Sequence, residues 1–112
     1  MAIQSVPVTT AAVDNTMFLC PGDVTTDPRE YAVTCMMFCN ISTDNVTLTV
    51  QAVPYLEVRG NNNIIIKDLL IPGGETFTFD TEKIVLATGD AIHAYASANS
   101  KLVATVSHMR VV

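Results

Sequence analysis

Apolar and polar residues alternate with a period of two along most of this chain, which is the pattern of half-buried β-strands. The segment VTLTVQAV at 46–53 shows it most clearly, because Val46, Leu48 and Val50 point one way while the threonines between them point the other. β-Branched residues are frequent and no long helical repeat interrupts them. The pattern predicts strands at residues 3–8, 16–20, 31–41, 46–53, 64–71, 75–80 and 83–86, followed by a C-terminal hairpin at 89–111.

About eight short strands at regular spacing predict an all-β fold, an antiparallel β-sandwich with a jelly-roll-like arrangement. We expect residues 1–112 to form a single domain around one core. Segment 31–41 is apolar on both faces, which indicates a central strand, whereas Pro7 favours an edge position or an irregular start for the first strand. A helix over residues 80–88 is the alternative for that stretch, because Asp80 could cap it.

Neither face of the predicted hairpin at 89–111 has the charged and polar residues typical of a solvent-exposed sheet face. With a turn at Asn99 and Ser100, His93 lies opposite Val106, and His108 is its diagonal neighbour on the same face. We expect one face of the hairpin to enter the core and the other to meet a partner chain. The expected core residues are Ile92, Ala94, Ala96, Val103 and Met109. The expected interface residues are His93, Tyr95, Val106 and His108.

Two sets of polar residues could bind a metal ion. His93 and His108, if adjacent, could hold a metal or sense pH, but the sequence indicates no third ligand beside them. The loop at 21–30 carries Asp23 and Asp27, which could bind calcium, but their spacing lacks the alternation of a dedicated calcium loop. We interpret the histidines as ordinary surface or interface residues and the loop as a solvated turn. The sequence therefore predicts no metal site and no cofactor.

Charged residues make up 15% of the chain, against about a quarter in a typical domain, and apolar residues make up 49%. This is too little charge to coat a monomer, so we expect a homo-oligomer or another arrangement that buries the surface against other chains. No apolar run is long enough to span a membrane, and the first residues do not resemble a signal peptide. The net charge is −5 and the six Lys and Arg residues are scattered, which disfavours nucleic acid and anionic membrane surfaces as partners.

The three cysteines, Cys20, Cys35 and Cys39, form no CxxC motif. On a strand, Cys35 and Cys39 would lie ~13 Å apart, too far for a disulfide, so we expect three buried thiols in a chain made in a reducing cytoplasm. No GxSxG motif or phosphate-binding glycine loop is present, and we expect no enzymatic activity. Asn40 and Asn45 each begin an N-glycosylation triplet, which we interpret as chance.

The C-terminal half, LLIPGGETFTFDTEKIVLATGDAIHAYASANSKLVATVSHMRV, resembles small virion proteins of tailed bacteriophages, particularly those of cyanobacterial phages. In these an IPAGET-like turn precedes a strand, then a KIVL segment, then a GD-containing strand and a final VS. The opening SVPVTTAAVDNTMFLCPG and the CNIS at 39–42 are similar as well. Within this motif, Gly89 can adopt a positive φ and Asp90 can accept a local backbone N–H, so the pair predicts a tight turn. The matching residues are Ile71 to Thr76, Lys83 to Leu86, Gly89, Asp90, Ile92, Ala94, Ala96, Ser97, Val103, Val106 and Ser107.

The resemblance implies a β-sandwich with a structural role in the virion, and it supplies no active site. Foremost among such roles is a capsid decoration or cement protein, made in the host cytoplasm and assembled in multiple copies on the major capsid protein. A neck, tail, baseplate or fibre-associated structural protein is the alternative. A host-carbohydrate-binding module is a further alternative, although the chain has no Trp and only three Tyr to stack on sugars.

Overall fold

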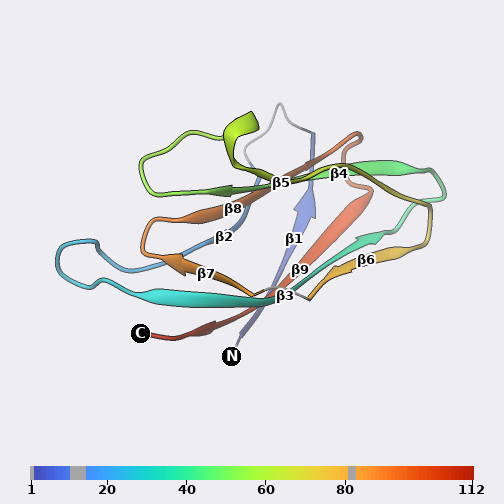
Figure 1. Cartoon of the computed structure of the whole chain (residues 1–112). Helices are drawn as coiled ribbons and strands as arrows, with labels where there is room; N and C mark the ends of the chain where they lie inside the picture. Colours follow the sequence, from blue (N-terminus) through green and yellow to red (C-terminus); the bar gives the residue numbers. More distant parts are fainter. Residues whose placement is uncertain (1, 11–14, 81–82) are drawn as a thin grey trace.

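The computed structural model of the chain describes residues 2–10, 15–80 and 83–112, which form nine β-strands in two antiparallel sheets packed face to face (Figure 1). The prediction of an all-β sandwich is confirmed. The described ranges contain no helix apart from a 3-10 turn, η1, at Asn61–Asn63. The helix considered for residues 80–88 is wrong where it can be compared, because Ile84–Ala87 form strand β7; residues 81–82 lie outside the described residues.

The first sheet, sheet A, has the order β1-β9-β3-β6, and β7 also pairs with β3. β3 is eleven residues long and pairs with β7 along its first part and with β6 along its second. Its predicted central position is confirmed, and β1, which carries Pro7, lies at the edge of the sheet as predicted. The strands of sheet A are β1 (Ala2–Val8), β3 (Glu30–Asn40), β6 (Thr76–Phe79), β7 (Ile84–Ala87) and β9 (Leu102–Arg110).

The second sheet, sheet B, has the order β2-β8-β4-β5. The bounds of β4 and β5 coincide with the predicted segments, and β2 ends one residue earlier than predicted. A bulge bends β5 at Asp68, whose φ is +49°, and Thr49 of β4 donates its hydroxyl to this carboxylate and accepts the Asp68 N–H. The strands of sheet B are β2 (Thr16–Leu19), β4 (Val46–Val53), β5 (Ile64–Ile71) and β8 (Ala91–Ala96).

The predicted C-terminal hairpin is wrong: β8 and β9 are consecutive in the chain but belong to opposite sheets (Figure 1). β8 pairs with β2 and β4, whereas β9 pairs with β1 and β3. The intervening residues 97–101 span the gap between the layers, because five residues reach further than the ~10 Å that separates packed sheets. The turn at 99–100 therefore joins two sheets rather than two paired strands.

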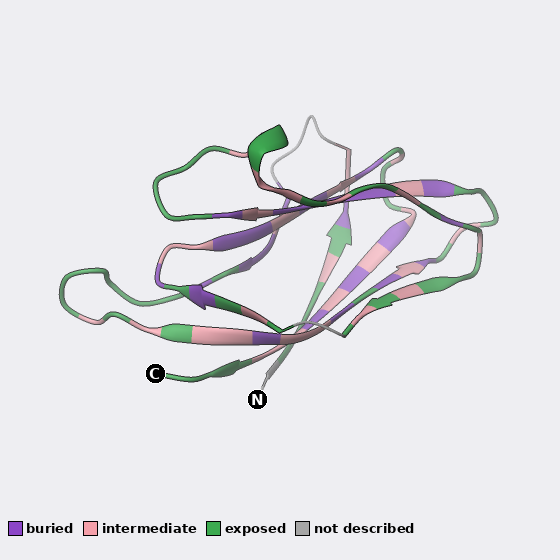
Figure 2. Ribbon diagram, viewed as in Figure 1, coloured by how far each residue is buried: buried purple, intermediate pink, exposed green. Residues whose placement is uncertain are grey.

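The core lies between the two sheets, and buried residues alternate with half-buried ones along β9 and most of β8 (Figure 2). Ile92, Ala94 and Ala96 of β8 are buried as predicted. The prediction for β9 is wrong, because Val106 is 0% exposed while Met109 is 41% exposed and Val103 is half-buried. The cause is the predicted hairpin. It assigned β8 and β9 to the same sheet, and this reversed the predicted inner and outer faces of β9. The largest fully buried side chains are Phe38, Met17, Met36, Leu48, Ile71, Ile92 and Leu102.

The Gly89-Asp90 turn has the geometry that the sequence predicts. Gly89 has a φ of +89°, and Asp90 accepts the Ala87 N–H through Oδ2 at 2.9 Å. Its Oδ1 accepts the Tyr55 N–H at 2.8 Å, which ties the end of β4 to the start of β8. One carboxylate thus holds both the turn and the loop beside it.

Candidate interaction surface

The outer face of sheet A is a broad sheet surface without charge. In β1, β3, β6, β7 and β9 the charged residues are Glu30 and Arg110, and both stand at strand ends. The outward positions between the ends are small, hydroxylated or apolar, which is unusual for a sheet face in contact with water. We call the following set the sheet A face: Ile3, Ser5, Pro7, Ala32, Cys35, Met37, Cys39, Thr76, Thr78, Val85, Val103, Thr105, Ser107 and Met109.

Large apolar side chains on the sheet A face are exposed rather than covered. Ile3 is 73% exposed, Val85 57%, Met109 41% and Met37 39%. They come from four different strands, so the apolar surface crosses the whole width of the sheet. Single exposed apolar residues are normal on a protein, whereas a continuous set of them marks a contact surface.

The centre of the sheet A face lies along the pairing of β3 with β9. Met37 is paired with Thr105, and Cys35 is paired with Ser107 one step along. Cys35 and Cys39 are free thiols and half-buried here, so the prediction that all three thiols are buried holds only for Cys20. The Cys20 thiol donates to the Leu86 carbonyl at 3.4 Å, and burial raises its pKa. The accessibility of Cys35 and Cys39 therefore depends on whether another chain covers the sheet A face, whereas that of Cys20 does not.

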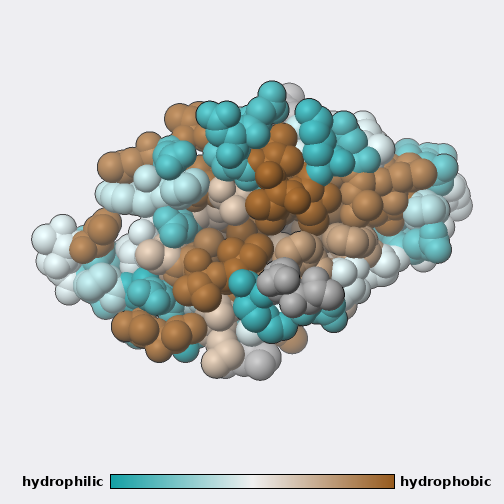
Figure 3. All heavy atoms as spheres, viewed as in Figure 1, coloured by the Kyte–Doolittle hydropathy of each residue, from teal (hydrophilic) through white to brown (hydrophobic). Residues whose placement is uncertain are grey.

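The outer face of sheet B differs in carrying charge and a crossing loop, although Leu19 and Leu70 are exposed on it as well. The loop between β4 and β5 crosses this face, and hydrophilic residues gather over β5 and η1 along the upper rim of the view in Figure 3. A hollow of about 290 Å³ lies beneath the loop, lined by Gln51, Val58, Arg59, Gly60, Asn61 and Tyr95. The same view shows hydrophobic residues along the edge of the sandwich between β5 and β7.

Two of the four predicted interface residues, His93 and Tyr95, lie on the outer face of sheet B. Both are half-buried, and His93 Nδ1 lies 3.4 Å from the Thr16 hydroxyl of β2. Tyr95 is paired with Thr49 and contributes to the hollow. Their outward direction matches the prediction, and a role in an interface stays a prediction.

The other two predicted interface residues, Val106 and His108, point between the sheets. Val106 is fully buried in the core. The His108 ring stacks on Phe18 with centroids 4.4 Å apart and contacts Tyr31 at 5.8 Å. Burial lowers the pKa of His108, and its buried Nδ1 has no hydrogen-bond partner among the described residues. Because His93 and His108 belong to different sheets, the adjacent histidine pair of the hairpin register does not exist.

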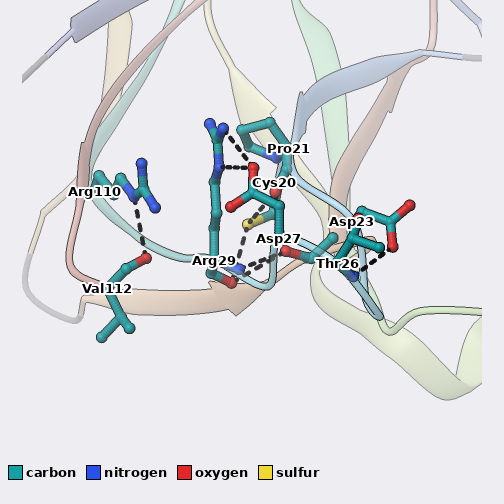
Figure 4. A network of polar contacts seen from close by, with 9 residues as sticks. Cys20, Pro21, Asp23, Thr26, Asp27, Arg29, Arg110 and Val112 are labelled. Atoms are coloured by element: carbon teal, nitrogen blue, oxygen red, sulfur yellow. Dashed lines mark hydrogen bonds and ion pairs between the residues drawn. The ribbon is translucent and has the colours of Figure 1, made fainter.

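The loop at 21–30 uses its carboxylates to hold its own shape (Figure 4). Asp23 Oδ1 accepts the N–H groups of Thr25 and Thr26 at 2.8 and 3.0 Å, which lowers the Asp23 pKa. Asp27 Oδ2 accepts Nη2 and Nε of Arg29 at 2.7 and 3.0 Å, and this pairing lowers the Asp27 pKa. In the described part of the chain no group of three or more His, Cys, Asp or Glu residues could hold a metal ion.

No protein family, curated protein or solved structure matches the chain in the comparisons made. Within the described ranges, no helix has the length and apolar character needed to cross a membrane. Sequence reasoning missed the sheet A face, although one signal was available: segment 31–41 is apolar on both sides, and a two-layer sandwich buries only one of them.

Proposed function

We propose that this protein is a non-enzymatic structural component of a tailed-phage virion, foremost a capsid decoration or cement protein present in many copies. The observation that carries the proposal is the sheet A face, an uncharged surface four strands wide with exposed Ile3, Met37, Val85 and Met109. A chain with this face exposed would be prone to associate, so its working form has the face covered. The resemblance of the C-terminal half to small virion proteins supports a virus particle as the place where the assembled protein acts.

The distribution of charge also favours a subunit of an assembly. The chain has a net charge of −5, and the described carboxylates stand on loops, strand ends or sheet B. Asp23, Asp27, Asp44 and Asp90 are each engaged by a backbone N–H, an Arg or a Lys that stabilises a turn. The charged groups therefore lie on loops, strand ends and sheet B, in contact with water, and the uncharged sheet A face is available for contact with other chains.

Placement at the neck, tail, baseplate or fibre is the alternative position on the particle, since the same face would serve there. A host-carbohydrate-binding module is the second candidate, and one observation favours it. The hollow on sheet B sets Tyr95 beside the amide and guanidinium groups of Gln51, Arg59 and Asn61, which combines an aromatic ring with hydrogen-bonding groups.

Copy number per particle, measured by quantitative mass spectrometry of purified virions of the encoding phage, tests the proposal. Hundreds of copies are expected for a shell component, and multiples of three, six or twelve indicate a neck or tail position. Absence from the particle would refute the virion role. Binding to a glycan array that Tyr95→Ala abolishes would favour the carbohydrate module instead.

A further inference from the structure

We propose that the sheet A face packs against the same face of a second copy of this chain, forming a two-fold symmetric dimer. The inference rests on the proposed assembly role of this face and names its partner. It predicts a four-layered dimer in which the two sheets A lie in the middle and the two sheets B lie outside. Three properties of the face carry the argument: its charge, its area and the kind of side chain at its centre.

The distribution of charge allows a second copy to be the partner. Two copies that each carry a net charge of −5 repel each other unless their contact surfaces leave the carboxylates in water. The sheet A face meets this condition, because Glu30 stands at the end of β3 and the face between the strand ends has no acidic or basic residue. At its rim, the Lys83 ammonium donates to the backbone carbonyls of Thr34 and Asp80 at 3.0 and 3.1 Å. A strongly basic or acidic partner would find no complementary charge on this face.

The projected area of the face is below the area that a standard interface buries on each partner. Four strand positions at ~4.8 Å and the nine residues of β9 at ~3.3 Å give a sheet of roughly 19 by 30 Å, or about 570 Å² in projection. Side chains add relief to that projection, and a standard interface buries roughly 800 Å² on each partner. The whole face, rather than a corner of it, is therefore the expected contact.

The residues at the centre suit a close approach of two sheets. Isologous contact places the two-fold axis near the pairing of β3 with β9, where Met37, Thr105 and Cys35 lie. Most side chains around this axis are short, so the two sheets can approach to the ~10 Å spacing of packed β-sheets. Met37 is the long, flexible side chain among them and would fill the space at the axis. Each Met37 then faces its own symmetry mate.

Sedimentation velocity of the full chain at about 1 to 200 µM tests the dimer. Met37→Asp brings two carboxylates together at the axis, and we expect it to weaken dimerisation at least about 100-fold relative to the unmodified protein. Leu70→Asp is the matched control, because Leu70 is an apolar residue, 54% exposed, on the outer face of sheet B. We expect this control to dimerise like the unmodified chain. Equal loss in both variants, or none in Met37→Asp, would overturn the inference.

The native thiols give a second test that needs no substitution. We expect Cys35 and Cys39 to react readily with an aromatic disulfide reagent at monomeric concentrations and to become protected at dimeric ones, while buried Cys20 stays slow throughout. Thiol reactivity that does not change with protein concentration would overturn the dimer. A monomer at every concentration, combined with many copies per virion, would refute the second copy as partner and leave the proposed virion role standing.

Discussion

Asn40 fastens one end of the sandwich through its side chain, and its replacement by Ala should be strongly destabilising. The residue is 0% exposed at the end of β3. Its Nδ2 donates to the carbonyls of Asp44 and Ile71 at 2.7 and 2.9 Å, so it links β3 to the following turn and to the end of β5 in the other sheet. Its Oδ1 accepts the Ser42 N–H at 3.0 Å and the Ser42 hydroxyl at 2.7 Å.

The magnitude follows from the groups that Ala would leave without a partner. The Nδ2 bond to the Ile71 carbonyl is buried, and a buried polar group left unsatisfied costs ~1–3 kcal/mol. The bonds to Asp44 and Ser42 are partly open to water, and each contributes roughly 0.5–1.5 kcal/mol. We expect Asn40→Ala to lower the free energy of unfolding by about 3 kcal/mol.

Urea denaturation followed by far-ultraviolet circular dichroism measures this loss. Asn45→Ala is the matched control, because Asn45 is an exposed asparagine in the adjacent turn and its change should cost less than about 0.5 kcal/mol. A loss below about 1 kcal/mol for Asn40→Ala would contradict the role given to this side chain. The result also bears on the N-glycosylation triplet at Asn40, since an amide enclosed in this way has no room for a glycan in the folded chain.

Three further predictions test the core, the Gly89 turn and the buried histidine. Val106→Asp should leave no folded protein by circular dichroism, because it places an unpaired charge in the core, and a folded monomer would mean that Val106 is on an outer face after all. Gly89→Ala should lower the unfolding free energy by ~2–3 kcal/mol, more than Gly74→Ala, because both have positive φ but only at Gly89 would the new Cβ overlap the Tyr55 ring. His108 has a folded-state pKa below the unfolded value of 6.5, so its contribution to stability is complete above pH 6.5 and is lost as the pH falls from there toward the folded pKa. The urea midpoint of the unmodified chain should therefore be lower at pH 5.5 than at pH 7.5, and this difference should be smaller in His108→Phe. An equal difference in the two proteins would exclude His108 as its cause.

Strand positions could be predicted from the sequence because each depends on local alternation. In β4, Val46, Leu48 and Val50 are buried and face the core as the pattern indicates. Thr49 and Gln51 were predicted to point away from the core, and they do, yet they are buried as well. The bulge at Asp68 covers one of them and the loop over sheet B covers the other, and neither contact is visible in a period-two pattern.

The partner of each strand could not be predicted in the same way, because pairing in a sandwich depends on contacts far apart in sequence. Adjacent strands separated by a short turn usually form a hairpin, and this expectation failed for β8 and β9. The error reversed the faces of β9, which placed Val106 and His108 outside instead of in the core. It also hid the sheet A face, which exists only when β9 lies between β1 and β3.

The most direct test of the central claim, that the sheet A face is where this chain joins others in the particle, is thiol labelling on intact virions. Purified particles and the isolated, dilute chain are treated with the same alkylating reagent, and labelling of Cys20, Cys35 and Cys39 is quantified by mass spectrometry. We expect Cys35 and Cys39 to be labelled in the dilute chain and protected in the particle, while Cys20 is protected in both. Equal labelling of Cys35 and Cys39 in the two samples would contradict this claim.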